Sequence, residues 1–228
     1  SHVHLDEMDH SKNEFVLLPN FRLPTHIHSR SANAKWLTEI AHRNPIWIHT
    51  KDAERLGVNN EDLLKITTAI GWFVDKVWVT EAIKPGVVAC SHHIGRWRRQ
   101  HDEGNRFMTN TVNIKNLGEG KWKMETVSGV EPWKTDDPDT NRVWWRDGGV
   151  HQNITHPTNP DPISGAHCWL QKVSISKPEP EEKYGDIFVD TNKSFEHFKN
   201  GMNGPKHGKH TPTACVDHFG CLDPYTRK

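Results

Sequence analysis

Between Asn44 and Cys90 the chain alternates short apolar runs with turn signals, and this rhythm restricts the folds that it can adopt. Residues 50–56 predict one small helix, capped by Thr50 and followed by Gly57, a residue that suits a helix C-terminus. Many short strands with only small helices between them indicate a barrel or sandwich rather than a doubly wound sheet. We therefore expect a mainly β fold. The expected strands cover residues 46–48, 63–68, 71–80 and 87–90.

Elements on either side extend this pattern. Residues 14–18 predict a further strand, and residues 32–43 predict a helix with Trp36 and Ile40 on one face. Residues 98–147 lose the pattern and read as a long surface insertion with one hairpin near 113–127. We expect three parts. Residues 1–13 would be a tag remnant or disordered edge, and residues 14–176 would form the barrel with its insertion at 98–147. Residues 177–228 would form a C-terminal extension with a short strand, a short helix and an extended tail.

The overall charge gives no reason to expect a nucleic acid or an anionic membrane as partner. Lys plus Arg and Asp plus Glu are both 29, so the formal net charge is zero. No apolar stretch reaches the roughly 18–20 residues that a membrane-spanning helix needs. Any anion recognised by this chain must therefore meet a local cluster of donors.

Three polar clusters border the expected strands. Brought together by a barrel, they would form one surface rich in imidazole, hydroxyl, amide and guanidinium groups, which suits a ligand with phosphates and ring heteroatoms. Gly95 would let the backbone approach such a ligand closely. The clusters are Thr25, His26, His28, Ser29 and Arg30; Ser91, His92, His93, Gly95 and Arg96; and His151, Gln152, Asn153 and Thr155, followed by Gln171.

Two other chemistries are conceivable for these clusters. His26 and His28 alternate like strand residues and could share a metal, whereas His92 and His93 would point to opposite faces of an extended chain, which weakens a shared metal site. Ser91 beside His92 lacks the strand-to-helix elbow and the oxyanion-hole signature of a serine nucleophile. Neither chemistry is favoured by the spacing.

The remaining unusual features suggest two alternative functions. The 17 histidines and a tail rich in histidine and cysteine would suit a zinc- or nickel-binding module; the tail residues are His207, His210, Cys215, His218 and Cys221. Retention of stoichiometric metal after chelator dialysis would favour that module. The tryptophan-rich stretch 98–147 would suit an interaction surface without cofactor contact. Cys90 and Cys168 lie in apolar runs typical of core residues.

The order of the motifs resembles a known family. Asn44-Pro45, Asp52-Ala53, Leu56-Gly57, Asp62 and "PGVV" at 85–88 stand in the order found in the C-terminal domain of the molybdopterin-dinucleotide oxidoreductases, the dimethyl sulfoxide reductase superfamily. The segments "FRLPTHIHSRSANAKWL" and "HQNITHPTNPDPISG" resemble its first and late cofactor loops. The resemblance covers roughly residues 14–176, and it departs at Asn60-Glu61, where the family usually has Asp-Gly.

This resemblance implies a six-stranded double-psi β-barrel that holds part of a bis(molybdopterin guanine dinucleotide) cofactor carrying molybdenum or tungsten. The histidines would bond to the organic cofactor and would not ligate the metal. The family's other parts would be partners, including an iron–sulfur-containing part, in a larger enzyme of the cytoplasm or periplasm. We expect the chain, as an excised domain or small subunit, to be inactive alone. The implied cofactor contacts are His26, His28, Ser29, Ser91, His92, His93, Gly95, Arg96, Asn153 and Gln171.

Overall fold

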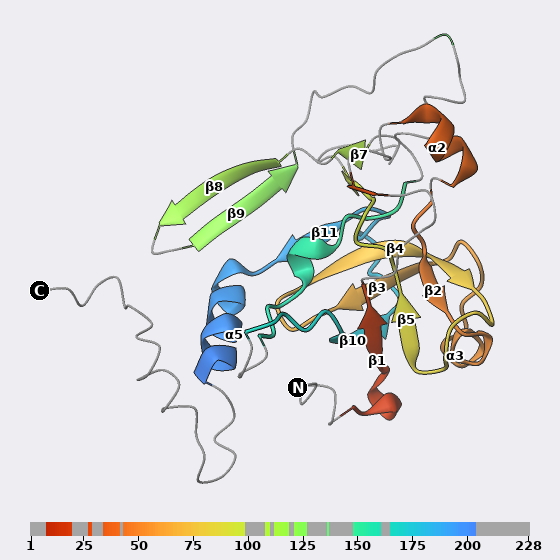
Figure 1. Cartoon of the computed structure of the whole chain (residues 1–228), viewed down its shortest axis with the longest axis horizontal. Coiled ribbons are helices and arrows are strands. Elements are labelled where there is room, and N and C mark those ends of the chain that lie inside the picture. The colour runs from red at the N-terminus through yellow and green to blue at the C-terminus, as the bar shows by residue number, and fades with distance from the viewer. Residues whose placement is uncertain are drawn as a thin grey trace, which may run out of the picture.

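A closed six-stranded β-barrel forms the centre of the molecule (Figure 1). The computed structural model describes residues 8–19, 27–28, 34–41, 43–98, 108–109, 112–118, 121–126, 136, 148–160 and 165–203. The strands are ordered β4-β2-β5-β1-β10-β3, and β3 pairs back with β4 to close the barrel. The predicted mainly β, six-stranded barrel is confirmed, and its double-psi connectivity stays a prediction. The barrel strands are β1 (Glu14–Leu18), β2 (Ile46–Ile48), β3 (Leu63–Thr67), β4 (Gly71–Val79), β5 (Val87–Ala89) and β10 (Gln171–Ser176).

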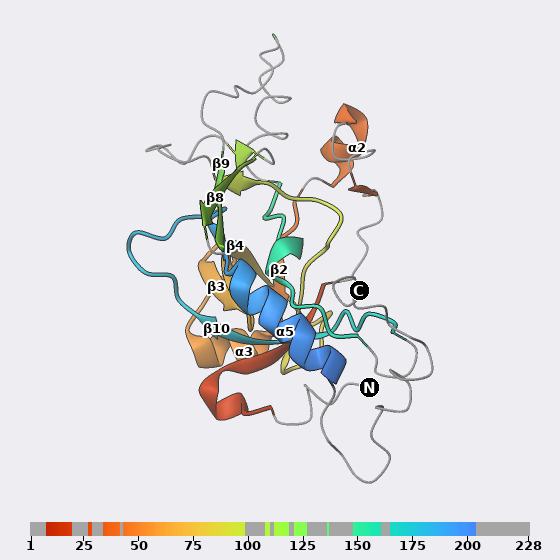
Figure 2. The same cartoon turned by 90° about the vertical axis from the view of Figure 1, so that its left-hand side faces the viewer.

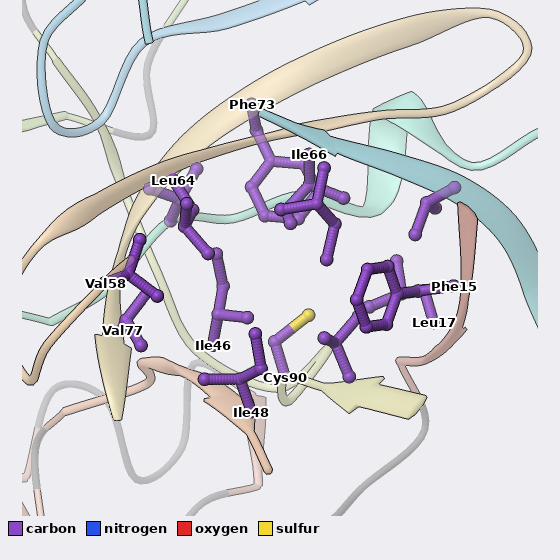
Figure 3. Close-up of a cluster of buried hydrophobic side chains, with 14 of the residues drawn as sticks. Phe15, Leu17, Ile46, Ile48, Val58, Leu64, Ile66, Phe73, Val77 and Cys90 are labelled. Carbon is purple, nitrogen blue, oxygen red and sulfur yellow. The ribbon is translucent and has the colours of Figure 1, made fainter. Parts of the chain in front are cut away.

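Alternation of side chains along the strands builds the core. In β1 and β3 every second residue is buried, as expected where one face of a strand lines a barrel interior. Figure 3 shows these apolar side chains pointing into a common interior, with Phe15 and Phe73 as the largest. Cys90 is 1% exposed and belongs to this cluster, as the sequence predicted.

Strand directions bring several connections to one end of the barrel. β1 and β5 are parallel, so the chain leaves both strands at the same end, through residues that follow Leu18 and Ala89. β10 is antiparallel to β1, and β2 is antiparallel to β5. Both therefore begin at this end, where Gln171 pairs with Leu17 and where Asn44 precedes β2. We call this the loop end of the barrel.

The helices are short and lie outside the barrel. α3 (Thr50–Leu56) ends at Gly57 in the predicted left-handed conformation, but its N-cap is His49, whose side chain accepts a hydrogen bond from the Lys51 amide. The predicted Thr50 cap is therefore wrong. α2 (Lys35–Ile40) is shorter than predicted and projects from the barrel in Figures 1 and 2, with Trp36 76% exposed.

The segment after residue 176 also contacts the barrel. β11 (Ile187–Val189) pairs with β4, Tyr184 is buried in the core, and α5 (Thr191–Asn203) follows. This matches the predicted strand and helix, and the division at residue 176 stays a prediction. Residues 10–12 form a short 3-10 helix (η2, His10–Lys12).

Few residues of the insertion are described, but they include the predicted hairpin. Strands β8 (Val112–Gly118) and β9 (Lys121–Thr126) pair outside the barrel (Figure 1). The short pair β6 (Trp97–Arg98) and β7 (Met108–Thr109) leads into the insertion. Within the described ranges no helix is both long and apolar enough to span a bilayer.

Candidate functional site

The second polar loop, residues 91–96, is anchored by the buried side chain of Asn44. The Asn44 amide nitrogen donates to the carbonyls of Ser91 (2.7 Å) and Ile94 (3.0 Å), and its oxygen accepts from the Ser91 amide (2.7 Å). Ser91 is fully buried, and its hydroxyl accepts from the His93 amide. Asn44 and Ser91 thus fix the backbone that carries His92 and His93.

Replacing Asn44 with alanine should lower the free energy of unfolding by about 2–3 kcal/mol, because it leaves buried loop groups without partners. Chemical denaturation would measure the change. Asn60→Ala is the matched control, since the exposed Asn60 side chain makes a single described bond, to the Val79 amide. Equal losses in both variants would show that Asn44 does not anchor the loop.

The second and third loops cross in direct contact. Arg96 pairs with Val150 in an isolated parallel bridge, and the Trp97 indole donates to the His151 carbonyl at 2.6 Å. Gly95 has φ +140°, and a side chain there would meet the backbone of Val150 and His151 at 2.3 Å. Gly95 therefore has a structural reason to be glycine: the close crossing of two loops, where the sequence suggested an approach to a ligand.

Two amide side chains of η3 and its N-cap complete this contact. Gln152, which is fully buried, donates to the Ser91 carbonyl (2.9 Å) and to the Cys90 sulfur (3.1 Å). Asn153, the first residue of η3 (Asn153–Thr155), donates to the His92 carbonyl at 3.2 Å. The predicted convergence of the second and third clusters is therefore a feature of the structure.

Imidazole rings from two loops gather at the loop end. The rings of His28 and His93 are 4.5 Å apart between centroids, and those of His92 and His93 are 4.0 Å apart. The expectation that His92 and His93 point to opposite faces is wrong, because residues 92–93 form a bend rather than extended strand. The other members of the first cluster, Thr25, His26, Ser29 and Arg30, lie outside the described residues.

Burial keeps the nearby histidines neutral. It is the main cause that lowers the pKa of His151, His156 and His167, and for His156 the pKa falls to about 3. Neighbouring imidazoles add to the shift of His156. Arg96, which remains protonated in proteins, is also mostly buried, and burial lowers its pKa. At pH 7 these three neutral imidazoles thus lie at the loop end together with the Arg96 guanidinium cation.

Several buried polar atoms at the loop end have no hydrogen-bond partner within the described part of the chain. They are Gln152 Oε1, Asn153 Oδ1, both ring nitrogens of His156, and His167 Nδ1. A buried polar atom without a partner costs about 1–3 kcal/mol, so such groups usually mark a ligand, an ion or water. Amide oxygens and imidazole nitrogens together match the edge of a heterocycle such as a pterin or guanine.

Gln171 differs from the other predicted contacts. Its amide oxygen accepts from Asn159 at 2.9 Å, and its nitrogen donates to the carbonyls of Cys168 and Trp169. The side chain is 1% exposed, so it holds the segment before β10 in place. This segment carries Trp169, whose ring lies 5.5 Å from that of His92.

Sequence reasoning missed His156, His167 and Trp169 as members of this face. His156 follows the predicted third cluster directly, and "AHCW" at 166–169 places His167 two residues before Trp169. Histidine and tryptophan in turn-rich segments that flank a predicted cluster were the available signal. The rings of His167 and Trp169 lie 4.8 Å apart.

Two pockets of described residues lie away from the imidazole cluster. The larger, about 570 Å³, borders α3 and the end of β4, so it lies at the opposite end of β2 from Asn44. Its described lining includes Glu54 but no cationic or imidazole side chain, which disfavours an anionic ligand. The smaller, about 300 Å³, lies beside β10 and includes Gln171 and His197. The size of the pockets therefore does not identify the loop end as a binding site. The donor groups at the loop end do.

Part of the chain is similar to a known protein family. A family model described as a molydopterin dinucleotide binding domain matches residues 16–118. Residues 16–118 therefore resemble a molydopterin dinucleotide binding domain, the domain type that the order of the sequence motifs predicts. The matched region begins within β1 and includes β2–β5 and the loop that carries His92, His93 and Arg96.

One curated relative comes from Halobacterium salinarum and is described as a putative catalytic subunit of dimethyl sulfoxide reductase; it is 33% identical over 79 residues. The match covers 35% of this chain and 9% of that protein, so the chain spans a small part of the relative's length. Among solved structures, acetylene hydratase from Pelobacter acetylenicus matches with a TM-score of 0.44 and 14% identity, over 78% of this chain and 20% of the other.

Proposed function

We propose that the loop end binds part of a bis(molybdopterin guanine dinucleotide) cofactor carrying molybdenum or tungsten. The chain would serve as the C-terminal domain or a small subunit of a larger oxidoreductase, with an iron–sulfur-containing part among its partners. The family of the domain supports the cofactor class. The curated relative, named as a catalytic subunit, supports the larger assembly.

One observation carries the proposal: the buried amide and imidazole atoms of Gln152, Asn153 and His156 face no described partner at the end where the loops converge. Main-chain and side-chain bonds fix the loops that carry them, so the groups are held in place before a ligand arrives. Fixed donors and acceptors bind with less loss of conformational entropy than mobile ones.

The residues divide into two roles under this proposal. Gln152, Asn153 and His156 would contact the cofactor through their unpartnered atoms. The other proposed contacts are His28, His92, His93 and Arg96, with Arg96 supplying positive charge for a phosphate. Ser91, Gly95 and Gln171 would position the loops, because their described bonds and contacts are to the protein itself. His26 and Ser29 remain proposed contacts. The cofactor would supply two-electron redox chemistry at its metal, and these side chains would bind and orient it.

The amount of cofactor bound to the enzyme tests this proposal. In the proposed complete enzyme, His92→Ala combined with Arg96→Ala should lower bound pterin and metal at least about tenfold, as the loss of supporting contacts does at other metal sites. Oxidised pterin fluorescence and metal analysis give the two readouts. The matched control is His197→Ala with Arg43→Ala, in which Arg43 loses an exposed bond to Glu61. Unchanged content in the His92/Arg96 variant, with the fold retained, would refute the site.

A further inference from the structure

We propose that His28, His92 and His93 form a three-imidazole site for a divalent transition-metal ion such as zinc. One ligand nitrogen from each residue lies within 4.8 Å of the others, the one such group found among the described residues. Sequence patterns alone do not indicate this trio, because the metal module that they suggest as an alternative lies in the tail and because His92 and His93 would point apart on an extended chain.

The spacing is close to that of a metal centre. Three atoms within 4.8 Å of one another fit inside a circle of at most about 2.8 Å radius, whereas zinc–imidazole bonds are about 2.0–2.1 Å. Each nitrogen therefore needs to move inward by at most about 0.7 Å, which small side-chain rotations can supply. Three protein ligands would leave the fourth tetrahedral position to water.

The surroundings of His92 fix the tautomer of its neutral ring. Its Nδ1 lies 3.1 Å from the Pro19 carbonyl oxygen, an atom that can only accept a hydrogen bond. In the neutral ring Nδ1 therefore carries the proton, and Nε2 is the unprotonated nitrogen. A histidine ligand that donates its other nitrogen to a carbonyl is the usual arrangement at protein metal sites.

Two of the three ligands lie on a backbone that is already fixed. The bonds of Asn44 hold Ser91 and Ile94, on either side of His92 and His93, and the Ser91 hydroxyl accepts from the His93 amide. His93 is 6% exposed, whereas His28 is exposed and comes from a separate segment. The exposed side of the trio would admit an ion from solvent to a pair of ligands that is already in position.

Ligand chemistry favours zinc over calcium or magnesium. The trio offers nitrogen donors alone, which suit zinc, copper and nickel, whereas calcium and magnesium require oxygen ligands. Because the same rings belong to the proposed cofactor face, zinc and the cofactor would exclude each other. The zinc site itself does not depend on the cofactor proposal, since the chain and the ion suffice to test it.

Titration of the full 228-residue chain, first stripped with chelator, tests the site by calorimetry with Zn²⁺ and by the visible spectrum of Co²⁺. We expect one zinc to bind, and His93→Ala to weaken this binding at least about tenfold. The cobalt complex should lack the thiolate-to-metal band that cysteine ligands produce. His197→Ala, which removes a histidine outside the trio, should change the zinc affinity less than about twofold.

One double variant distinguishes metal binding at this site from metal binding by the histidine- and cysteine-rich tail. Cys215→Ser with Cys221→Ser should keep the zinc stoichiometry and the cobalt spectrum. Loss of binding in this double variant, a thiolate band, or zinc affinity that survives His93→Ala would each place the ion elsewhere and overturn the proposal. Absence of zinc binding to the folded chain would show that the three imidazole rings pack together but bind no ion.

Discussion

Replacing Gly95 with alanine is expected to lower the free energy of unfolding by about 4 kcal/mol. The residue has φ +140°, a conformation that non-glycine residues avoid at a cost of about 1–3 kcal/mol. The new Cβ would also lie 2.3 Å from the His151 nitrogen and the Val150 carbonyl carbon. Those atoms are backbone, so relief requires the two loops to separate, which adds about 1–3 kcal/mol.

Gly57→Ala is the matched control for this prediction. Gly57 also has a positive φ, of +63°, but an added Cβ would meet nothing within 4 Å. We expect this variant to lose only about 1 kcal/mol, from backbone strain. Urea denaturation of both variants gives the comparison. A Gly95 variant no less stable than the Gly57 variant would show that the loops do not cross as closely as the structure has them.

Acidification is expected to destabilise the barrel by about 4 kcal/mol through His156 between pH 6.5 and pH 3. Its pKa is lowered to about 3 in the folded chain, against 6.5 for an exposed imidazole. Below pH 6.5 the unfolded chain binds a proton that the folded chain does not bind, so stability falls as the pH falls. The lowered pKa values of His151 and His167 act in the same direction.

Unfolding free energies measured at pH 7 and pH 5 isolate the contribution of the histidines to the pH dependence of stability. The carboxylates with lowered pKa values change the stability mainly below about pH 4.5. His156→Leu should reduce the change in unfolding free energy between pH 7 and pH 5 by about 2 kcal/mol, because leucine fills a similar volume and cannot be protonated. The same pH dependence in the leucine variant would mean that His156 is accessible to protons in the folded barrel.

The barrel could be predicted from the sequence because its signals are local. Apolar runs such as residues 63–67 alternate buried and half-exposed side chains, and Gly57 ends α3 as expected. Motif residues used to recognise the family also prove to be structural. Asp52 accepts a hydrogen bond from the Gly86 amide at 2.7 Å, and so joins the helix motif to the turn before β5.

The site was less predictable because its geometry depends on contacts between distant segments. Nothing local in "NP" at 44–45 indicates that Asn44 anchors a loop 47 residues later. Likewise, Gly95 is glycine because residues 150–151 cross it, and the bend at 92–93 reverses the expected divergence of two histidines. The polar character of the loops was therefore visible in the sequence, whereas the partners of each side chain were not.

The most direct test of cofactor binding is a nuclear magnetic resonance titration of the 228-residue chain with molybdopterin guanine dinucleotide released from a molybdoenzyme. We expect the amide signals of residues 91–96 and 151–156 to shift together as the ligand is added. Signals of Thr50 and Asn59, which border the larger pocket at the opposite end of β2, should stay in place. Shifts confined to that pocket, or none at saturating ligand, would contradict the assignment of the cofactor to the loop end.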